Sequence, residues 1–325
     1  MKIVKQSYEI LEQEIPVHKL DDYSGYHFRE QYLENMYKHI ERCGRTCYKS
    51  EDKITPDSSK KFVDGLIKSK HLSVLEHGAV YLKYIFNPFK GEGKEFLKRY
   101  TFNPYSKMKS KILEYEDKPL EEQKIGEKIE VHKAVTYVST NFRVLVENNW
   151  LDDLQYLCEP TEYHELRHTA LLHACIHVYK DLTRHRPMSF SIESTRYCNY
   201  FKGKFGSELT FVKLPWTKII PDTYDSSILQ KLYDDDIMPV EDINFIASLC
   251  SIEESYMYFI KEVKWEPQQA AEILPQCLAA DVIMSGFESD WRHVFNLRSD
   301  IAATGKPHPL VEELMTPLRK EMLHE

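Results

Sequence analysis

RHRPMSFSIESTRYCNY, residues 184–200, is the stretch on which the interpretation of this sequence depends. Its first thirteen positions hold three arginines, one histidine, three serines and one glutamate. Arginine is permanently charged and presents a rigid fork of donors that matches phosphate oxygens. Three such forks among hydroxyl groups predict a site for a ligand with several phosphates. A solvated basic loop is the alternative, but Phe190 and Tyr197 interleave with the charges, and solvated loops seldom need aromatic side chains.

Composition limits the class of protein and of partner. The chain has 325 residues, enough for one large domain or two, and 42% of them are hydrophobic, as in a globular protein. The formal net charge of -8 argues against nucleic acid as a partner, because no domain-wide positive field exists to release counterions. A local group of arginines in an acidic protein instead favours a small anionic ligand.

Targeting and redox signals point to the cytoplasm. No apolar stretch of signal-peptide length follows Met1, and no run approaches the roughly 18 apolar residues of a membrane helix. The seven cysteines are odd in number and scattered through the chain, as buried free thiols in a reducing compartment would be. We therefore expect a cytoplasmic protein with no membrane partner.

The first third of the chain predicts a helix, a turn and a strand. Thr55-Pro56-Asp57 is a helix start, and the apolar stripe that follows it ends near Lys70. Residues 78–86 are rich in β-branched and aromatic side chains and predict a strand. The block from His71 to His77 should therefore lie in the turn between them, where binding residues are common.

The middle of the chain predicts an insertion. Residues 87–165 are loosely patterned, charged and turn-prone, with helical character over 139–157. We expect this segment to be inserted into one compact domain that spans 1–325.

The remaining elements surround the arginine-rich stretch. Residues 169–176 predict a buried strand, and a short helix from Val178 should end at Arg186, because Pro187 disfavours helix there. Arg184, His185 and Arg186 would then occupy its last turn. Residues 201–221 predict a loop with extended segments, and the C-terminal third predicts helices over 241–263, 266–284, 288–299 and 308–323.

A zinc site is the main competing interpretation. His164, Glu165 and His168 satisfy the pattern H-E-x-x-H, which on a helix would place two zinc ligands on one face with Glu165 as general base. Only three positions are fixed, and Arg167 would hold a permanent charge beside the metal. We therefore predict no metal site here, and we expect His173 to be a core or hydrogen-bonded histidine.

Other common chemistries lack their sequence signals. The chain contains no glycine-rich phosphate loop, so a Rossmann-type flavin site is not expected. Ser194 has no His–Asp relay at recognisable spacing, which argues against a nucleophilic serine. Arg298 ends a predicted helix with Trp291, Val294 and Phe295, and an ordinary solvated helix end is its alternative explanation.

Three blocks of the sequence resemble the flavin-dependent thymidylate synthases. The first is Arg184-His185-Arg186, followed by Ser194 and Thr-Arg-Tyr; the others are residues 71–77 and 289–298. The resemblance implies an α/β (α+β) domain of that family's type, with an insertion and a helical C-terminal third, assembled as a homotetramer with active sites shared between subunits. It implies reductive methylation of dUMP to dTMP, in which methylenetetrahydrofolate supplies the carbon, FAD carries the hydride and NADPH reduces the flavin.

The resemblance also implies roles for particular residues. Arg298 would be the catalytic group that polarises the uracil ring. The substrate would be bound by Asp181, Arg184, Glu193, Ser194 and Arg196. FAD would be bound by His71, Ser73, Arg184, His185, Arg186, Ser191 and His293.

Departures from the family pattern concern the substrate. Asp181 replaces a usual Gln, and a carboxylate cannot donate to a phosphate, so its role should be structural or directed at ribose or an arginine. Ile192 and Ala271 replace a usual polar residue and a usual arginine. A related pyrimidine nucleotide, a hydroxymethylating variant of the reaction, and a non-catalytic nucleotide-binding protein therefore stay open.

Overall fold

The chain forms two compact units. The computed structural model describes residues 1–17, 25–112, 133–194, 198–200, 208–234 and 237–325. The first unit consists of Met1–Glu12, Glu41–Thr55 and His168–Glu325, and the second of Gln13–Ile40 and Pro56–Arg167. Helices and strands occur in both, so the fold is mixed α and β, as the sequence predicts.

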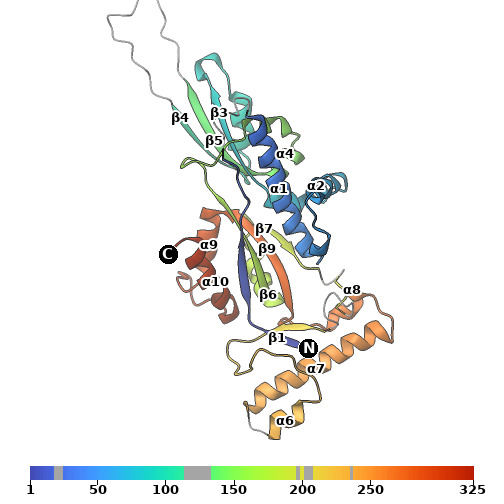
Figure 1. Cartoon of the computed structure of the whole chain (residues 1–325). Coiled ribbons are helices and arrows are strands. Elements are labelled where there is room, and N and C mark those ends of the chain that lie inside the picture. Colours follow the sequence, from blue (N-terminus) through green and yellow to red (C-terminus); the bar gives the residue numbers. More distant parts are fainter. Residues whose placement is uncertain (18–24, 113–132, 195–197, 201–207, 235–236) are drawn as a thin grey trace, which may run out of the picture. The chain divides into compact units, whose positions relative to one another are not determined.

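The first unit contains a four-stranded sheet in the order β2-β6-β9-β7 (Figure 1). These strands are β2 (Ser7–Leu11), β6 (Arg167–Cys175), β7 (Ser189–Ile192) and β9 (Ala279–Phe287). β2 pairs with β6 and β7 pairs with β9, both in antiparallel register. The two inner strands, β6 and β9, carry long apolar runs because both of their faces are covered.

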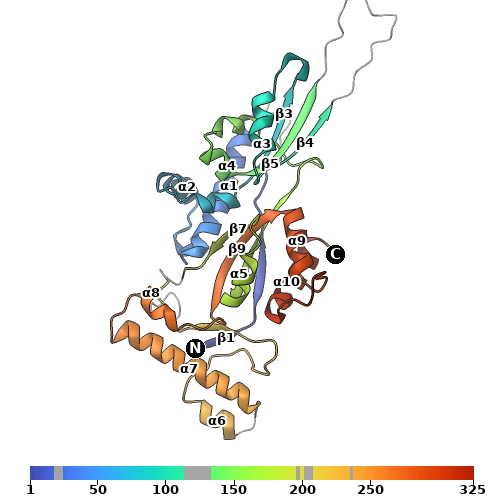
Figure 2. The same ribbon diagram turned by 180° about the vertical axis from the view of Figure 1, so that it is seen from behind.

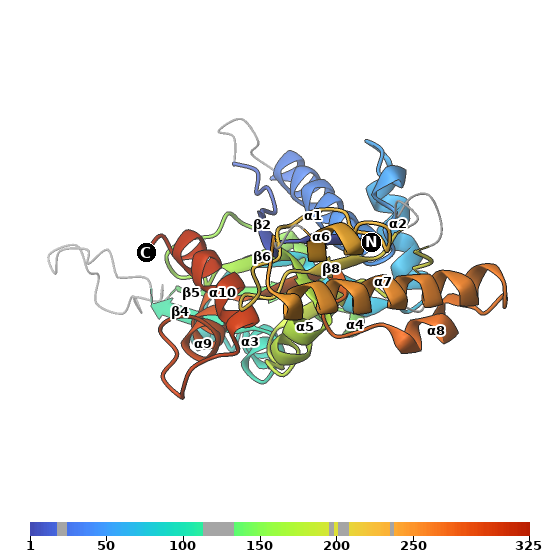
Figure 3. The same ribbon diagram turned by 90° about the horizontal axis from the view of Figure 1, so that it is seen from below.

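Three helices cover one face of this sheet. They are α5 (Ile176–Leu182), α9 (Glu288–Arg298) and α10 (Pro309–Met322), and α9 and α10 lie side by side (Figures 2 and 3). Leu172 of β6 and Val282 and Met284 of β9 pack against them in one hydrophobic core. The alternate residues Leu171 and Ile283 face the other side, where they meet Cys43. Cys43 belongs to α1 (Tyr26–Cys47), which contributes residues to both units.

A second core of the first unit surrounds two short parallel strands. β1 (Lys2–Val4) pairs with β8 (Thr210–Val212). Ile3 and Phe211 from these strands are buried with Ile246 and Tyr256 of the long helix α7. The helices of this region are α6 (Leu229–Asp234), α7 (Val240–Lys261), α8 (Pro267–Ala270) and the 3-10 helix η7 (Ala271–Ile273). The first unit also contains the 3-10 helix η1 (Glu51–Lys53).

The second unit is built on an antiparallel sheet in the order β3-β5-β4. Its strands are β3 (Ala79–Phe86), β4 (Lys107–Ile112) and β5 (Ala134–Asn141). Its helices are α2 (Ser58–Lys68), α3 (Lys94–Thr101), α4 (Phe142–Glu147) and the 3-10 helices η2 (Leu72–His77), η3 (Pro88–Lys90) and η5 (Leu151–Tyr156). Tyr32 and Met36 of α1 pack with Val80, Leu82 and Val138 in its core.

Sequence patterns locate several elements correctly. The predicted strands 78–86 and 169–176 are β3 and β6, and the predicted helices 241–263, 288–299 and 308–323 are α7, α9 and α10. The helix expected from Thr55 is α2, which starts at Ser58. The turn expected to hold His71 and Ser73 contains η2.

Three predictions about elements are wrong. The helix expected over 266–284 is replaced by α8, η7 and strand β9, because Pro275 interrupts a helix and a strand buried on both faces lacks a period-2 signal. Residues 139–157 begin in β5 before α4 and η5. α5 ends at Leu182, so Arg184–Arg186 lie beyond its last turn; the His185 N–H bonds the Leu182 carbonyl at 3.0 Å.

Residues 87–165 lie entirely in the second unit, together with 13–40 and 56–86. Phe96 and Val138 from this segment share a core with Tyr32 and Val80. The unit therefore begins earlier in the chain than the insertion that the sequence predicts. The assignment of 1–325 to one family-type domain stays a prediction.

The state of the cysteines and the character of the helices can be compared with the expectation of core thiols and of no membrane helix. All seven cysteines are free, and six of them are buried, as expected for core thiols. None of the helices in the described part of the chain combines the length and apolar character needed to span a bilayer.

Trp291 should be the main anchor of α9. Its side chain is fully buried, its ring stacks on Phe295, and its Nε1–H donates to the His168 carbonyl at 3.1 Å. We predict that Trp291→Ala lowers the free energy of unfolding by about 3–5 kcal/mol, measured by urea titration. Trp291→Phe should cost about 1–2 kcal/mol, because it loses mainly the hydrogen bond. The exposed Asn296→Ala is the control, and a loss below about 1 kcal/mol in Trp291→Ala would contradict this role.

Candidate active site

The arginine-rich stretch links two charged clusters of the first unit. It leaves α5 through a turn at Thr183–Met188, forms β7, and continues through Glu193 and Ser194. Arg196 lies outside the described residues. Phe190 and Ile192 pack on the helix-bearing side, so Ser191 and Glu193 face the other side of the sheet.

The first cluster joins the end of α5 to the end of α9. The Arg298 Nε–H donates to His185 Nε2 at 3.3 Å, and its Nη1 lies 3.6 Å from an Asp181 carboxylate oxygen. Asp181 also lies 3.5 Å from Arg184 Nη1. The His293 ring makes an edge contact with His185, with 5.9 Å between centroids. The structure thus brings together five of the residues that the sequence singles out, and it directs Asp181 at two arginines.

His185 is held in its neutral form. Its residue is 7% exposed, and burial together with the nearby Arg298 guanidinium lowers its pKa from 6.5 to about 4. A neutral imidazole can accept from the Arg298 Nε–H, whereas an imidazolium would repel it. Arg298 is therefore oriented by an acceptor that does not cancel its charge.

The outer side of this cluster carries available donors. The Arg184 side chain is 71% exposed, and Arg186 and His293 are also exposed. Arg186 forms no ion pair with any residue that the structure describes. Two guanidinium groups two residues apart, both reachable from solvent, are suited to adjacent phosphates. His71, which precedes η2, and Ser73 of η2 are exposed in the second unit, and their predicted role stays a prediction.

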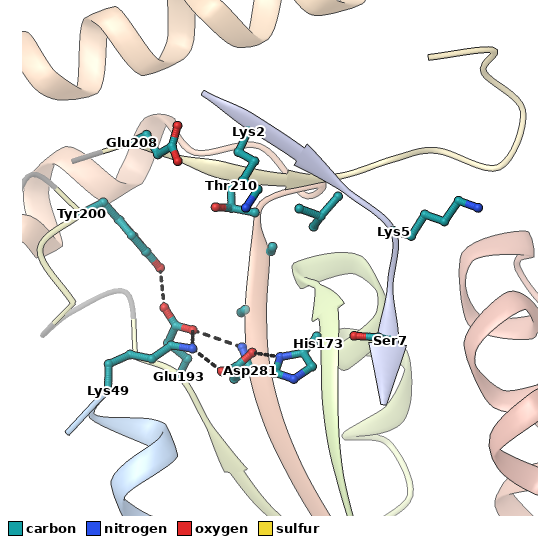
Figure 4. Close-up of a pocket in the computed structure, with 13 residues that line it drawn as sticks. Lys2, Lys5, Ser7, Lys49, His173, Glu193, Tyr200, Glu208, Thr210 and Asp281 are labelled. Atoms are coloured by element: carbon teal, nitrogen blue, oxygen red, sulfur yellow. Dashed lines mark hydrogen bonds and ion pairs between the residues drawn. The ribbon is translucent and has the colours of Figure 1, made fainter. Parts of the chain in front are cut away.

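The second cluster faces a cavity of about 560 Å³ (Figure 4). Lys49 Nζ lies 3.2 Å from Glu193 and also contacts Asp281. Asp281 lies 2.5 Å from His173 Nδ1, and the Tyr200 hydroxyl donates to Glu193 at 3.1 Å. Burial raises the pKa of Asp281, but the hydrogen bond from His173 and the nearby Lys49 ammonium group together hold this pKa below its usual range. His173 is thus hydrogen-bonded, as expected.

Glu193 and Ser191 are buried on the other face of the sheet, and their predicted roles in binding stay predictions. Glu193 is 6% exposed, and its carboxylate is taken up by Lys49, Tyr200 and the Asp281 N–H, which donates at 3.1 Å. Ser191 is buried and interacts with Cys47. Neither side chain lies on the side of the exposed guanidinium groups. Sequence reasoning did not identify Lys49, Asp281 and Tyr200 as members of a site. The one local signal in the sequence is that Asp281 is an acid inside an apolar run.

The H-E-x-x-H segment is not helical. His164 ends a turn, and residues 167 and 168 begin β6. His164 Nδ1 accepts from the Thr161 N–H at 3.0 Å, and its Nε2 lies 3.1 Å from the Leu82 carbonyl. Within the described residues no group of three His, Cys, Asp or Glu side chains could hold a metal ion. The helical arrangement that the zinc hypothesis requires is therefore absent from this segment.

Neutral His185 should make stability depend on pH. Its folded pKa of about 4 is below the 6.5 of an unperturbed histidine, so the unfolded chain binds more protons between these pH values. This contribution is fully present above about pH 6.5 and is lost as the pH falls through about 4. We predict that His185→Asn loses less stability than the parent between pH 7 and pH 4, by up to about 3 kcal/mol in urea titrations. Exposed His27→Asn is the control; equal losses in parent and His185→Asn would contradict the assignment.

Comparisons with known proteins show which families and structures this chain is similar to. The model of a family described as thymidylate synthase complementing protein matches residues 163–322, and no curated protein matches the sequence. A UMP/dUMP methylase, PolB from Streptomyces cacaoi, is similar over 100% of this chain in two structures. The form bound with 5-Br UMP has 12% sequence identity to this chain, 92% of its chain is covered, and the TM-score is 0.39. The form bound with 5-Br dUMP has 11% identity, 93% of its chain is covered, and the TM-score is 0.38. Thymidylate Synthase X from Helicobacter pylori, with FAD and dUMP, has 15% identity over 49% of this chain and 66% of its own, with a TM-score of 0.32. Residues 163–322 thus match the thymidylate synthase complementing protein family, in agreement with the resemblance that the arginine-rich stretch carries.

Proposed function

We propose that this protein is a flavin-dependent methyltransferase that replaces the hydrogen at C5 of a pyrimidine nucleotide with a methyl group. In its specific form, the proposal is conversion of dUMP to dTMP, with methylenetetrahydrofolate as carbon donor and NADPH as reductant. The observation that carries it is the contact between Arg298 and neutral His185 inside the family-matched segment. It gives an oriented, permanently charged donor next to two exposed guanidinium groups.

The donor set of the first cluster fits FAD. Arg184 and Arg186 expose their guanidinium groups beside His185 and His293, which suits a diphosphate next to an aromatic ring system. We assign them to FAD binding, and by resemblance His71 and Ser73 also. FAD, when bound, supplies the hydride that NADPH provides. The residues of the chain bind it and orient the nucleotide.

Arg298 is assigned to the uracil ring. Bond formation at C5 draws electron density from N3 and the ring carbonyls, so negative charge develops along that edge. A guanidinium stabilises such charge with two donors and does not lose its proton at physiological pH. His185 and Asp181 limit the rotation of Arg298, so its position is set before the substrate arrives. No nucleophile of the enzyme is required.

The identity of the nucleotide is the least constrained part of the proposal. Ser194 and Arg196 are assigned to its phosphate by resemblance, and the Glu193 carboxylate is occupied by Lys49 and Tyr200. Asp181 lies against Arg184 and Arg298, which supports a role for Asp181 through these arginines. Turnover assays with dUMP and UMP in parallel distinguish the two substrates, and product mass separates methyl from hydroxymethyl transfer. Binding without turnover of either would support a non-catalytic protein.

Assembly and location complete the proposal. We assign a homotetramer with sites shared between subunits, which sedimentation can test. The free cysteines in both units support a reducing compartment such as the cytoplasm.

Replacement of Arg298 should separate flavin chemistry from nucleotide chemistry. We predict that Arg298→Ala still binds FAD and that NADPH still reduces the flavin, while dTMP formation falls by about 10²–10³. Arg298→Lys should recover little, because a point charge cannot reproduce the fork. The control is Arg292→Ala, an exposed arginine of the same helix. Near-parental dTMP formation by Arg298→Ala would make Arg298 an ordinary helix-end cation.

Replacement of Arg186 should weaken FAD. Charge-assisted hydrogen bonds contribute about 1.5–3 kcal/mol each, so Arg186→Ala should bind FAD about one to two decades more weakly in a fluorescence titration. Lys180→Ala, which removes an exposed cation from α5, is the matched control and should leave affinity unchanged. Unchanged affinity in Arg186→Ala would mean that this guanidinium faces something other than FAD.

A further inference from the structure

Two histidine rings stack at the start of α10. The ring centroids of His177, on α5, and His308 are 3.9 Å apart, with 36° between the ring planes. His177 Nδ1 lies 3.2 Å from Gln276 Oε1, and the exposed Trp216 indole makes an edge contact with the His308 ring, with 5.9 Å between centroids. Both histidines are partly exposed, so protons from solvent can reach this histidine stack.

His308 is also the N-cap of α10. Its Nδ1 accepts from the Leu310 N–H at 3.3 Å, and its carbonyl accepts from the N–H groups of Val311 at 2.9 Å and Glu312 at 3.0 Å. The side-chain bond requires a lone pair on Nδ1, which the neutral ring has and the imidazolium lacks. A proton on Nδ1 would therefore remove this cap and place a positive charge at the positive end of the helix dipole.

The groups around the His308 ring act in opposite directions. Burial and the neighbouring His177 lower the pKa of His308 below its usual 6.5, whereas the Asp181 carboxylate opposes this shift. The titratable and charged groups that act on the ring thus come from one helix, α5, while Trp216 and Gln276 contribute neutral groups. Since two charged rings in one stack would repel each other, the observed arrangement favours neutral histidines.

The helix turn that His308 caps packs on the helices that carry the first cluster. Leu310 is buried in one core with Val178 of α5 and Phe295 of α9. Asp181 lies in the last turn of α5, Arg298 ends α9, and their side chains are 3.6 Å apart. A change at the start of α10 can therefore reach Arg298 through both helices.

We propose that the histidine stack is a pH-sensitive switch that holds the first turn of α10 in place at neutral pH and releases it in acid. When His308 Nδ1 takes up a proton, the Leu310 N–H loses its acceptor. The new cation also competes with Arg298 for Asp181, so the first cluster loosens. This last consequence, a regulation of methyl transfer, rests on the proposed function, whereas the switch itself does not.

The direction of the pH dependence follows from His308. Its pKa in the folded chain is below 6.5, so the released turn binds the proton more readily than the capped turn. The cap is therefore fully formed above about pH 6.5 and is lost as the pH falls through the lowered pKa of His308.

Hydrogen exchange in the full chain measures the switch directly. We predict that the protection factors of the Leu310, Val311 and Glu312 N–H groups fall about two- to thirtyfold between about pH 7.5 and about pH 5, as expected for loss of an N-cap. His308→Asn keeps a capping acceptor that does not titrate, so its protection should not depend on pH in this range. The control is His324→Asn, which removes an exposed histidine beyond the end of the same helix and should respond like the parent.

NMR titration of the His308 ring gives a second readout. His177→Asn removes the stacked imidazole, so it should raise the pKa of His308 toward 6.5 and reduce the loss of protection in acid. Constant protection in the parent, an equal pH response in the parent and His308→Asn, or an unchanged His308 pKa in His177→Asn would each overturn the proposal. Because these measurements need neither FAD nor dUMP, a protein that shows the switch but methylates no nucleotide would retain this inference and reject only the proposed function.

Discussion

The alternation of side chains along β9 is the constraint on which the first unit depends. Val282 and Met284 pack under the helices, while Asp281 and Ile283 face the other side. A slip of one residue would bury Asp281 against the α9–α10 layer and expose the apolar residues, so the register is strongly fixed. That single register keeps the two charged clusters on opposite faces and sets which residues of β7 can reach each one.

Arg298 illustrates how a cation can be positioned without being neutralised. A carboxylate alone would orient it but would also offset its charge toward a substrate. Here a neutral imidazole accepts the Nε–H at 3.3 Å, and Asp181 stands at 3.6 Å and is shared with Arg184. The replacement of the family's usual Gln by Asp181 therefore changes the charge of the cluster by one unit.

The sequence predicts the parts of this fold whose signals are local. α9 and α10 follow from periodic apolar residues, and α10 from Pro309 at its first position. The sequence pattern wrongly predicts that the helix over 266–284 extends into β9, because a strand buried on both faces has an unbroken apolar run without a period-2 signal. The first cluster could be anticipated because its residues fall in recognisable motifs. The second cluster could not, because Lys49, Tyr200 and Asp281 come from segments far apart in the sequence and meet only in the folded chain. An acid inside the run 279–287 was the available clue.

The two clusters have a common consequence for the signature segment. At its start, His185 is held by Arg298; at its end, Glu193 is held by Lys49, Tyr200 and the backbone of Asp281. Between these points β7 is paired with β9 from Ser189 to Ile192. Burying Glu193 and Asp281 costs solvation free energy, which Lys49 and the hydrogen bonds offset only in this geometry. The ionic network on the face of the sheet opposite the helices therefore restrains the segment that exposes Arg184 and Arg186. A substitution in either cluster should change the position of residues in the other cluster, because β7 connects the two.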